Sequence, residues 1–142
     1  MVKSTSAKSF AFRLTPGADL KKSIIEFAKT NGIAAGAVTT CVGSLKQVNI
    51  RFANQPKGTN ITGFFEIVSL VGTFSTTAGH FHIAVADERG HTMGGHLLEG
   101  NLVYTTAEVA VVDLVEMEFS REMDLASGYH ELVVKARDHA VD

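Results

Sequence analysis

Apolar and polar side chains alternate along most of the chain after Val38, in short segments separated by glycines and polar turns. A period of two is typical of β-strands with one buried face, because successive side chains point to opposite sides of a sheet. Phe10, Phe12 and Leu14 show the same alternation near the N-terminus. The later strands predicted by this pattern are Val38–Leu45, Gln47–Ala53, Ile61–Val71, His80–Ala86, Gly95–Tyr104, Val109–Phe119 and His130–Ala136.

One segment has the periodicity of a helix instead. Asp19 can cap it and Gly32 can end it, and its apolar positions fall on one face: Leu20, Ile24, Phe27 and Ala28. Short turns between strands favour antiparallel pairing. The sequence therefore predicts an α+β fold, a mainly antiparallel β-sheet flanked by helices.

The length of 142 residues suits one domain with a buried core. We expect a polar N-terminal tail over residues 1–8, a domain over residues 9–137 and a C-terminal tail over residues 138–142. With 45 % hydrophobic and 20 % charged residues, the chain is not disordered. The mean hydropathy of +0.14 is high for a small soluble monomer and predicts that apolar surface is buried between subunits.

Charge and targeting signals limit the partners. A formal charge of −2 is unlike that of a domain that binds nucleic acid by itself, since neutralising phosphates supplies most of that affinity. No apolar run approaches the roughly 20 residues that cross a bilayer, and the polar N-terminus lacks the apolar core of a signal peptide. The single cysteine, Cys41, is expected to be a small buried side chain. We expect a cytoplasmic protein with no membrane partner.

Three histidines form the strongest candidate site. His80 and His82 lie on one face of a predicted strand, with Phe81 on the other face. After a turn near Asp87, the chain returns through two glycines to His96. Three neutral imidazoles with a fourth position open are a recognised catalytic zinc set. The sequence therefore predicts that these three histidines bind zinc or another divalent metal.

This site depends on the pairing register of the two strands. If the residue numbers of facing partners have an even sum, His96 lies on the same face as His80 and His82. An odd sum would need one bulge, which Gly94 and Gly95 are suited to provide. The alternative is that the histidines are separate surface or core residues.

Two further polar residues stand out within predicted strands. Glu66 shares a face with Phe64, Val68 and Leu70, so we expect it to be partly buried and to need a partner. Arg51 could be that partner in an ion pair. The functional interpretation places Glu66 near the metal as an acid or base and Arg51 as the group that holds an anion.

Several runs of sequence carry a resemblance that extends over nearly the whole chain. They are Thr15–Leu20, Val42–Leu45, Gly63–Thr73, Gly79–His82, Gly94–Gly100, Val103–Glu108 and Phe119–Glu122. In this order they resemble the plants-and-prokaryotes conserved (PPC) domain family. The resemblance implies an α+β domain that forms a homotrimer, with His80, His82 and His96 able to ligate zinc or a similar divalent metal.

The same resemblance brings a label of DNA binding. Plant members of the family join this domain to AT-hooks, and prokaryotic members are commonly labelled DNA-binding for that reason. An AT-hook needs a basic Arg-Gly-Arg core that enters the minor groove, and this sequence has none. The label is therefore not supported by the charge of the chain.

Two functions remain open on the sequence alone. The first is a non-enzymatic PPC trimer that binds metal, with possible association with DNA or a partner protein. The alternative is a small metal-dependent enzyme, of lyase or hydrolase type, that acts on an anionic small molecule with help from Glu66 and Arg51. The distant similarity of the PPC fold to acetolactate decarboxylase, which holds a metal through three histidines, is compatible with the alternative. Fold alone does not carry function.

Overall fold

The computed structural model describes residues 4–138, which form one helix and eight strands. The elements are β1 (Ala7–Leu14), α1 (Leu20–Asn31), β2 (Gly36–Arg51), β3 (Thr59–Phe74), β4 (Gly79–Ala86), β5 (Thr92–Leu97), β6 (Leu102–Leu114), β7 (Met117–Asp124) and β8 (Tyr129–Ala136). Strands and one short helix confirm the predicted α+β class, and the helix lies in the segment where helical periodicity was expected. This helix is neither long nor apolar enough to cross a membrane.

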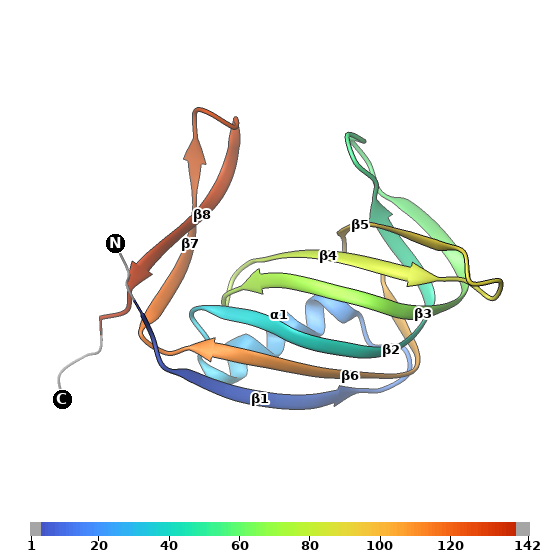
Figure 1. Ribbon diagram of the computed structural model, residues 1–142, viewed down its shortest axis with the longest axis horizontal. Coiled ribbons are helices and arrows are strands. Elements are labelled where there is room, and N and C mark those ends of the chain that lie inside the picture. Colours follow the sequence, from blue (N-terminus) through green and yellow to red (C-terminus); the bar gives the residue numbers. More distant parts are fainter. Residues whose placement is uncertain (1–3, 139–142) are drawn as a thin grey trace.

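Six strands form one antiparallel sheet in the order β1-β6-β2-β3-β4-β5 (Figure 1). The far edge of this sheet curls back, because β5 also pairs with the end of β2, where Ile50 faces Leu97 and Arg51 faces His96. Strands β2, β3, β4 and β5 therefore close into a ring at one end of the molecule. The remaining two strands form a separate hairpin, β7–β8, which extends away from the main sheet (Figure 1).

Helix α1 begins and ends where its caps predict. Asp19 Oδ1 accepts a hydrogen bond of 3.1 Å from the Lys22 N–H, and Gly32 ends the helix with φ of 64°. Asp19 Oδ2 also accepts a 2.7 Å bond from the Gly100 N–H, so the same carboxylate ties the start of the helix to the turn after β5. The fully buried face of α1 consists of Leu20, Ile24 and Ala28.

Two predicted strands are interrupted in the structure, and two others are continuous. The segment Gly95–Tyr104 is divided between β5 and β6 by a tight turn, and Val109–Phe119 by the turn between β6 and β7. The segments Val38–Leu45 and Gln47–Ala53 lie instead on the single strand β2, which continues to Arg51 through an irregularity in register. Alternation alone does not locate bulges or turns, because it shows only which residues share a face of a strand.

A bulge in β3 changes which side chains are buried. The register shifts between Ile67 and Ser69, so Val68 and Ser69 are both exposed and Leu70 returns to the core. The prediction that Glu66 is partly buried on a face shared with Leu70 is therefore wrong. Glu66 lies on the exposed face instead.

Candidate metal centre

Strand β4 presents two of the histidines. Phe81, Ile83 and Val85 are buried in the core at 3 % exposure or less, which anchors one face of the strand. His80 and His82 consequently project from the opposite, exposed face. The local fold thus follows directly from the alternation in the sequence.

Strand β5 brings the third histidine to the same face. His82 lies directly opposite His96 in the antiparallel ladder, and the pairing of β4 with β5 contains no bulge. The even-sum register is therefore the correct one. Gly94 and Gly95 have a different use, since an added Cβ would lie 2.5 Å from the Ile83 carbonyl oxygen and 2.5 Å from the Arg51 carbonyl oxygen, respectively. The two glycines let β5 approach both of its neighbouring strands closely.

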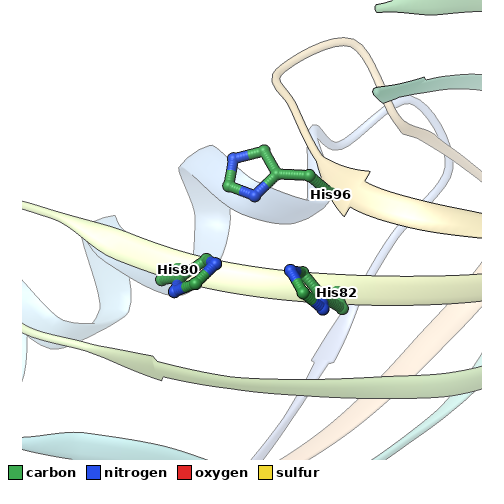
Figure 2. A group of neighbouring side chains, drawn as sticks. All are labelled: His80, His82 and His96. Atoms are coloured by element: carbon green, nitrogen blue, oxygen red, sulfur yellow. The ribbon is translucent and has the colours of Figure 1, made fainter. Parts of the chain in front are cut away.

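The three imidazoles converge on one point (Figure 2). Their ring centroids are 5.0 Å apart for His80 and His82, 5.3 Å for His80 and His96, and 5.9 Å for His82 and His96. One nitrogen of each ring lies within 4.8 Å of the others. Tetrahedral zinc, with Zn–N bonds of about 2.0–2.1 Å, needs nitrogens roughly 3.3 Å apart. Small side-chain rotations close the difference, so the residues present fit a divalent ion.

Nothing in the described part of the chain restrains these rings in another arrangement. None of the three imidazoles forms a hydrogen bond or an ion pair with a described residue. Ring nitrogens that are free of partners can act as ligands without breaking an existing contact. The second nitrogen of each ring also remains available to donate to water, which orients ligating histidines in many sites.

Burial and neighbouring charges lower the pKa of two of the three histidines, His80 and His96. Burial, with the positive charge of Arg51 as the next cause, lowers the pKa of His96 to about 4. Burial and the neighbouring His82 also lower the pKa of His80 below its usual value. Both imidazoles are therefore unprotonated at neutral pH, which is the form that binds metal.

Positive side chains surround the cluster. Arg51 faces His96 across the β2–β5 ladder and is half-buried. The charges of Lys21 on α1 and Arg121 on β7 also act on His80, together with one acidic group, Glu131. The ladder places Arg51 beside His96, and its role in holding an anion stays a prediction.

Glu66 lies elsewhere on the same face of the sheet. It pairs with Ala86, which is four residues along β4 from His82, or about 13 Å at 3.3 Å per residue. There it lines a separate cavity of about 380 Å³ with Phe64 and Tyr104. Among the described residues no ion pair joins Glu66 to Arg51. The structure therefore does not bring Glu66 to the histidine cluster.

The remaining histidines and the cysteine lie outside the cluster. His91 Nδ1 is 3.7 Å from Asp87 Oδ2 in the turn between β4 and β5, and His130 lies on β8. His139 falls outside the described residues. Cys41 is buried, as expected, and burial raises the pKa of its thiol to about 11, so it is not a nucleophile at neutral pH.

Sequence reasoning did not identify Lys21 or Arg121 as neighbours of the histidines. Lys21 belongs to the polar surface of an amphipathic helix, and Arg121 lies far along the chain on a separate hairpin. Neither residue has a local pattern that distinguishes it from an ordinary surface cation. Only the three-dimensional arrangement of α1, β4 and β7 brings them close.

Comparisons with protein families and curated proteins agree with one another. The model of the Plants and Prokaryotes Conserved (PCC) domain matches residues 1–115. Two curated relatives, the bifunctional protein GlmU of two Synechococcus strains, are each 42 % identical over 130 residues, which is 92 % of this chain. The chain spans only 21 % of the length of these relatives.

Solved structures share the fold over most of their length. A hypothetical protein from Salmonella is 38 % identical, with a TM-score of 0.93 over 95 % of this chain and 98 % of its own. A metal-containing protein from Archaeoglobus fulgidus is 26 % identical, with a TM-score of 0.80 over 94 % of this chain and 99 % of its own. A protein from Bacteroides thetaiotaomicron, described as a candidate DNA-binding protein, is 22 % identical with a TM-score of 0.77, covering 92 % and 98 % of the two chains.

Proposed function

The chain belongs to the Plants and Prokaryotes Conserved domain family, and on that basis we propose that it binds a divalent metal ion, zinc in the first place, through His80, His82 and His96. The observation that carries this proposal is the convergence of three ligand nitrogens within 4.8 Å on the exposed face of β4 and β5. The similarity to a metal-containing protein of Archaeoglobus fulgidus supports it.

The donor set also supports zinc or a related ion over calcium or magnesium. Imidazole nitrogen suits zinc, copper, iron and nickel, whereas calcium and magnesium prefer oxygen ligands. Three nitrogen donors leave one position open, where a bound ion would act as a Lewis acid. The chain itself would hold three imidazoles on two adjacent strands, with the Arg51 charge beside His96.

Metal content per chain tests the proposal directly. Untagged protein purified without chelator and analysed by elemental mass spectrometry is expected to hold about one divalent ion per chain. His80→Ala and His96→Ala each remove one of three ligands, and the affinity for zinc is expected to fall by at least about 100-fold, more than the loss of an outer-sphere partner.

His130→Ala is the matched control, because it removes an exposed histidine that lies on β8, outside the cluster. This variant is expected to keep the wild-type metal content, and circular dichroism checks that all variants are folded. A wild-type protein that takes up no ion even after incubation with zinc would refute the proposal. Unchanged zinc affinity in both His80→Ala and His96→Ala would refute the choice of ligands.

DNA binding is not part of this proposal. The protein from Bacteroides thetaiotaomicron is only 22 % identical in sequence to this chain, so the similarity between them shows the fold alone. The 13 basic and 15 acidic residues leave the chain with a charge of −2. A protein that binds duplex DNA by itself usually needs a coherent positive surface.

We also propose that copies of this chain associate through an apolar patch, in the trimer that the family resemblance implies. The patch consists of Val42, Phe64, Val68, Val71 and Tyr104, which are 43–58 % exposed. The rings of Phe64 and Tyr104 are in contact, with centroids 4.9 Å apart. A patch of this kind on a small domain is typical of an interface between subunits.

Val68→Asp tests the association, because a carboxylate in the middle of the patch would be desolvated without a partner. Wild-type protein is expected to elute from size exclusion with a scattering mass near three times the 15.2 kDa of one chain. The variant is expected to shift toward the mass of one chain. Leu125→Asp, at a position 95 % exposed between β7 and β8, is the control and should not change the mass. A wild-type protein that is monomeric at micromolar concentration would contradict the proposal.

A further inference from the structure

A cavity of about 400 Å³ lies between the β7–β8 hairpin and the connection from β3 to β4. Figure 1 shows this connection at the same end of the sheet as the base of the hairpin. One wall carries the hydroxyl residues Ser75, Thr76 and Thr77, and the other carries Phe119 and Arg121. A hydrogen bond of 3.0 Å from the Phe119 N–H to the Ala34 carbonyl fixes the hairpin against the rest of the domain.

The cation in this cavity, Arg121, has no ion-pair partner among the described residues. Arg121 is half-buried and forms no ion pair and no side-chain hydrogen bond with any residue between 4 and 138. A guanidinium that is partly removed from water is stabilised by an anion, to which it can donate two parallel hydrogen bonds. The opposite wall offers hydroxyl groups that can donate as well.

The acid that lines the same cavity, Glu118, lies beside a lysine. Glu118 lies opposite Lys135 in the β7–β8 ladder. The Lys135 ammonium sits among negative charges, since it donates a 2.9 Å hydrogen bond to Glu122 and also experiences the charge of Glu118. Arg121 projects from the other face of β7, as its partner Leu132 also lines the cavity. Its side chain is therefore directed into the cavity, where no described residue forms an ion pair with it.

The cavity adjoins the histidine cluster. Thr73, which lines the cavity, is the ladder partner of His80. Residues paired in this way have Cβ atoms about 5 Å apart. The positive charge of Arg121 also acts on His80. A molecule seated in the cavity would thus lie beside the proposed metal ion.

We propose that this cavity binds the oxyanion group, a carboxylate or a phosphate, of a small-molecule ligand through the Arg121 guanidinium and the hydroxyl groups of Ser75, Thr76 and Thr77. Another part of the same ligand would contact the metal ion, and this part of the proposal rests on the function proposed above. Binding of the oxyanion by Arg121 does not depend on the metal.

Titration of ¹⁵N-labelled protein with sodium phosphate and with sodium acetate, at constant ionic strength and without added metal, tests the proposal by NMR. Saturable shifts are expected at the amides of residues 75–78 and 119–121. Arg121→Gln is expected to weaken binding about tenfold or more, because it removes a charge-assisted bidentate contact. Arg121→Lys is expected to be intermediate, since it keeps the charge but loses the planar fork.

Arg89→Gln is the matched control, as it removes the same charge from an exposed turn and should leave the affinity unchanged. Tighter binding of phosphate than of acetate would identify a phosphorylated ligand, and the reverse would identify a carboxylate. Equal affinities in Arg121→Gln and Arg89→Gln, or shifts confined to other amides, would overturn the proposal. Repeating the titration with His96→Ala separates the two sites, because anion binding should persist there even if the metal proposal fails.

Discussion

Replacing Asn101 with aspartate is expected to lower the free energy of unfolding by about 3 kcal/mol or more at pH 7. The Asn101 side chain is completely buried in the turn between β5 and β6. Its Oδ1 accepts a 2.9 Å hydrogen bond from the Asn49 N–H, and its Nδ2 donates 2.9 Å and 2.8 Å bonds to the carbonyls of Asn49 and Leu98. A carboxylate in this position would face two carbonyl oxygens without a proton to donate, and it would be desolvated.

The pH dependence distinguishes this cause from a general loss of packing. The introduced carboxyl group would have a folded-state pKa above its unfolded value of about 3.9. Its penalty is therefore absent below that unfolded value and increases as the pH rises toward the folded-state pKa. Urea unfolding of wild type and Asn101→Asp should show a smaller difference in stability at pH 4.5 than at pH 7. Asn60→Asp, at an exposed position on β3, is the control, and a penalty at Asn101 no larger than at Asn60 would contradict the prediction.

The second large effect is expected for Phe81→Ala, which should cost about 3–5 kcal/mol of stability. Phe81 lies between His80 and His82 in the sequence, but its side chain is completely buried on the other face of β4. Its ring stacks against Phe74 with centroids 6.0 Å apart. Truncation leaves a cavity that the surrounding strands cannot fill without moving β4. Because β4 carries His80 and His82 on its other face, the same change should also weaken metal binding.

Thermal and urea unfolding measure this effect, and Phe64→Ala provides the comparison within the same sheet. Phe64 is 51 % exposed, so its truncation should cost the isolated chain less than about 1 kcal/mol. Measurements on Phe64→Ala must be compared at equal protein concentration, since Phe64 belongs to the apolar patch. A loss of less than about 1 kcal/mol for Phe81→Ala would show that the core does not depend on this ring.

The parts of the fold that were predictable are those with strong local signals. The capping carboxylate of Asp19 and the left-handed Gly32 mark both ends of α1, and the structure begins and ends the helix there. The alternation around Phe81 likewise placed His80 and His82 on the exposed face of β4. In each case the local preference and the tertiary packing favour the same conformation.

The parts that were not predictable depend on contacts between distant segments. The exposed position of Glu66 results from a bulge near Val68, and a bulge has no clear signal in one strand because its partner strand defines it. The division of Gly95–Tyr104 depends on Asn101, whose hydrogen bonds reach β2, about fifty residues earlier in the chain. Arg121 becomes notable only when the hairpin folds against the β3–β4 connection.

The proposed anion site uses one part of the chain, the β7–β8 hairpin, that contributes no ligand to the proposed metal site. The segment that matches the family model ends at residue 115, and the β7–β8 hairpin begins only afterwards, at Met117. Substitutions in the hairpin can therefore alter what the cavity accepts without changing β4 or β5, which carry the three histidines. Such an arrangement allows ligand preference to change by mutation of the hairpin while the three histidines stay the same.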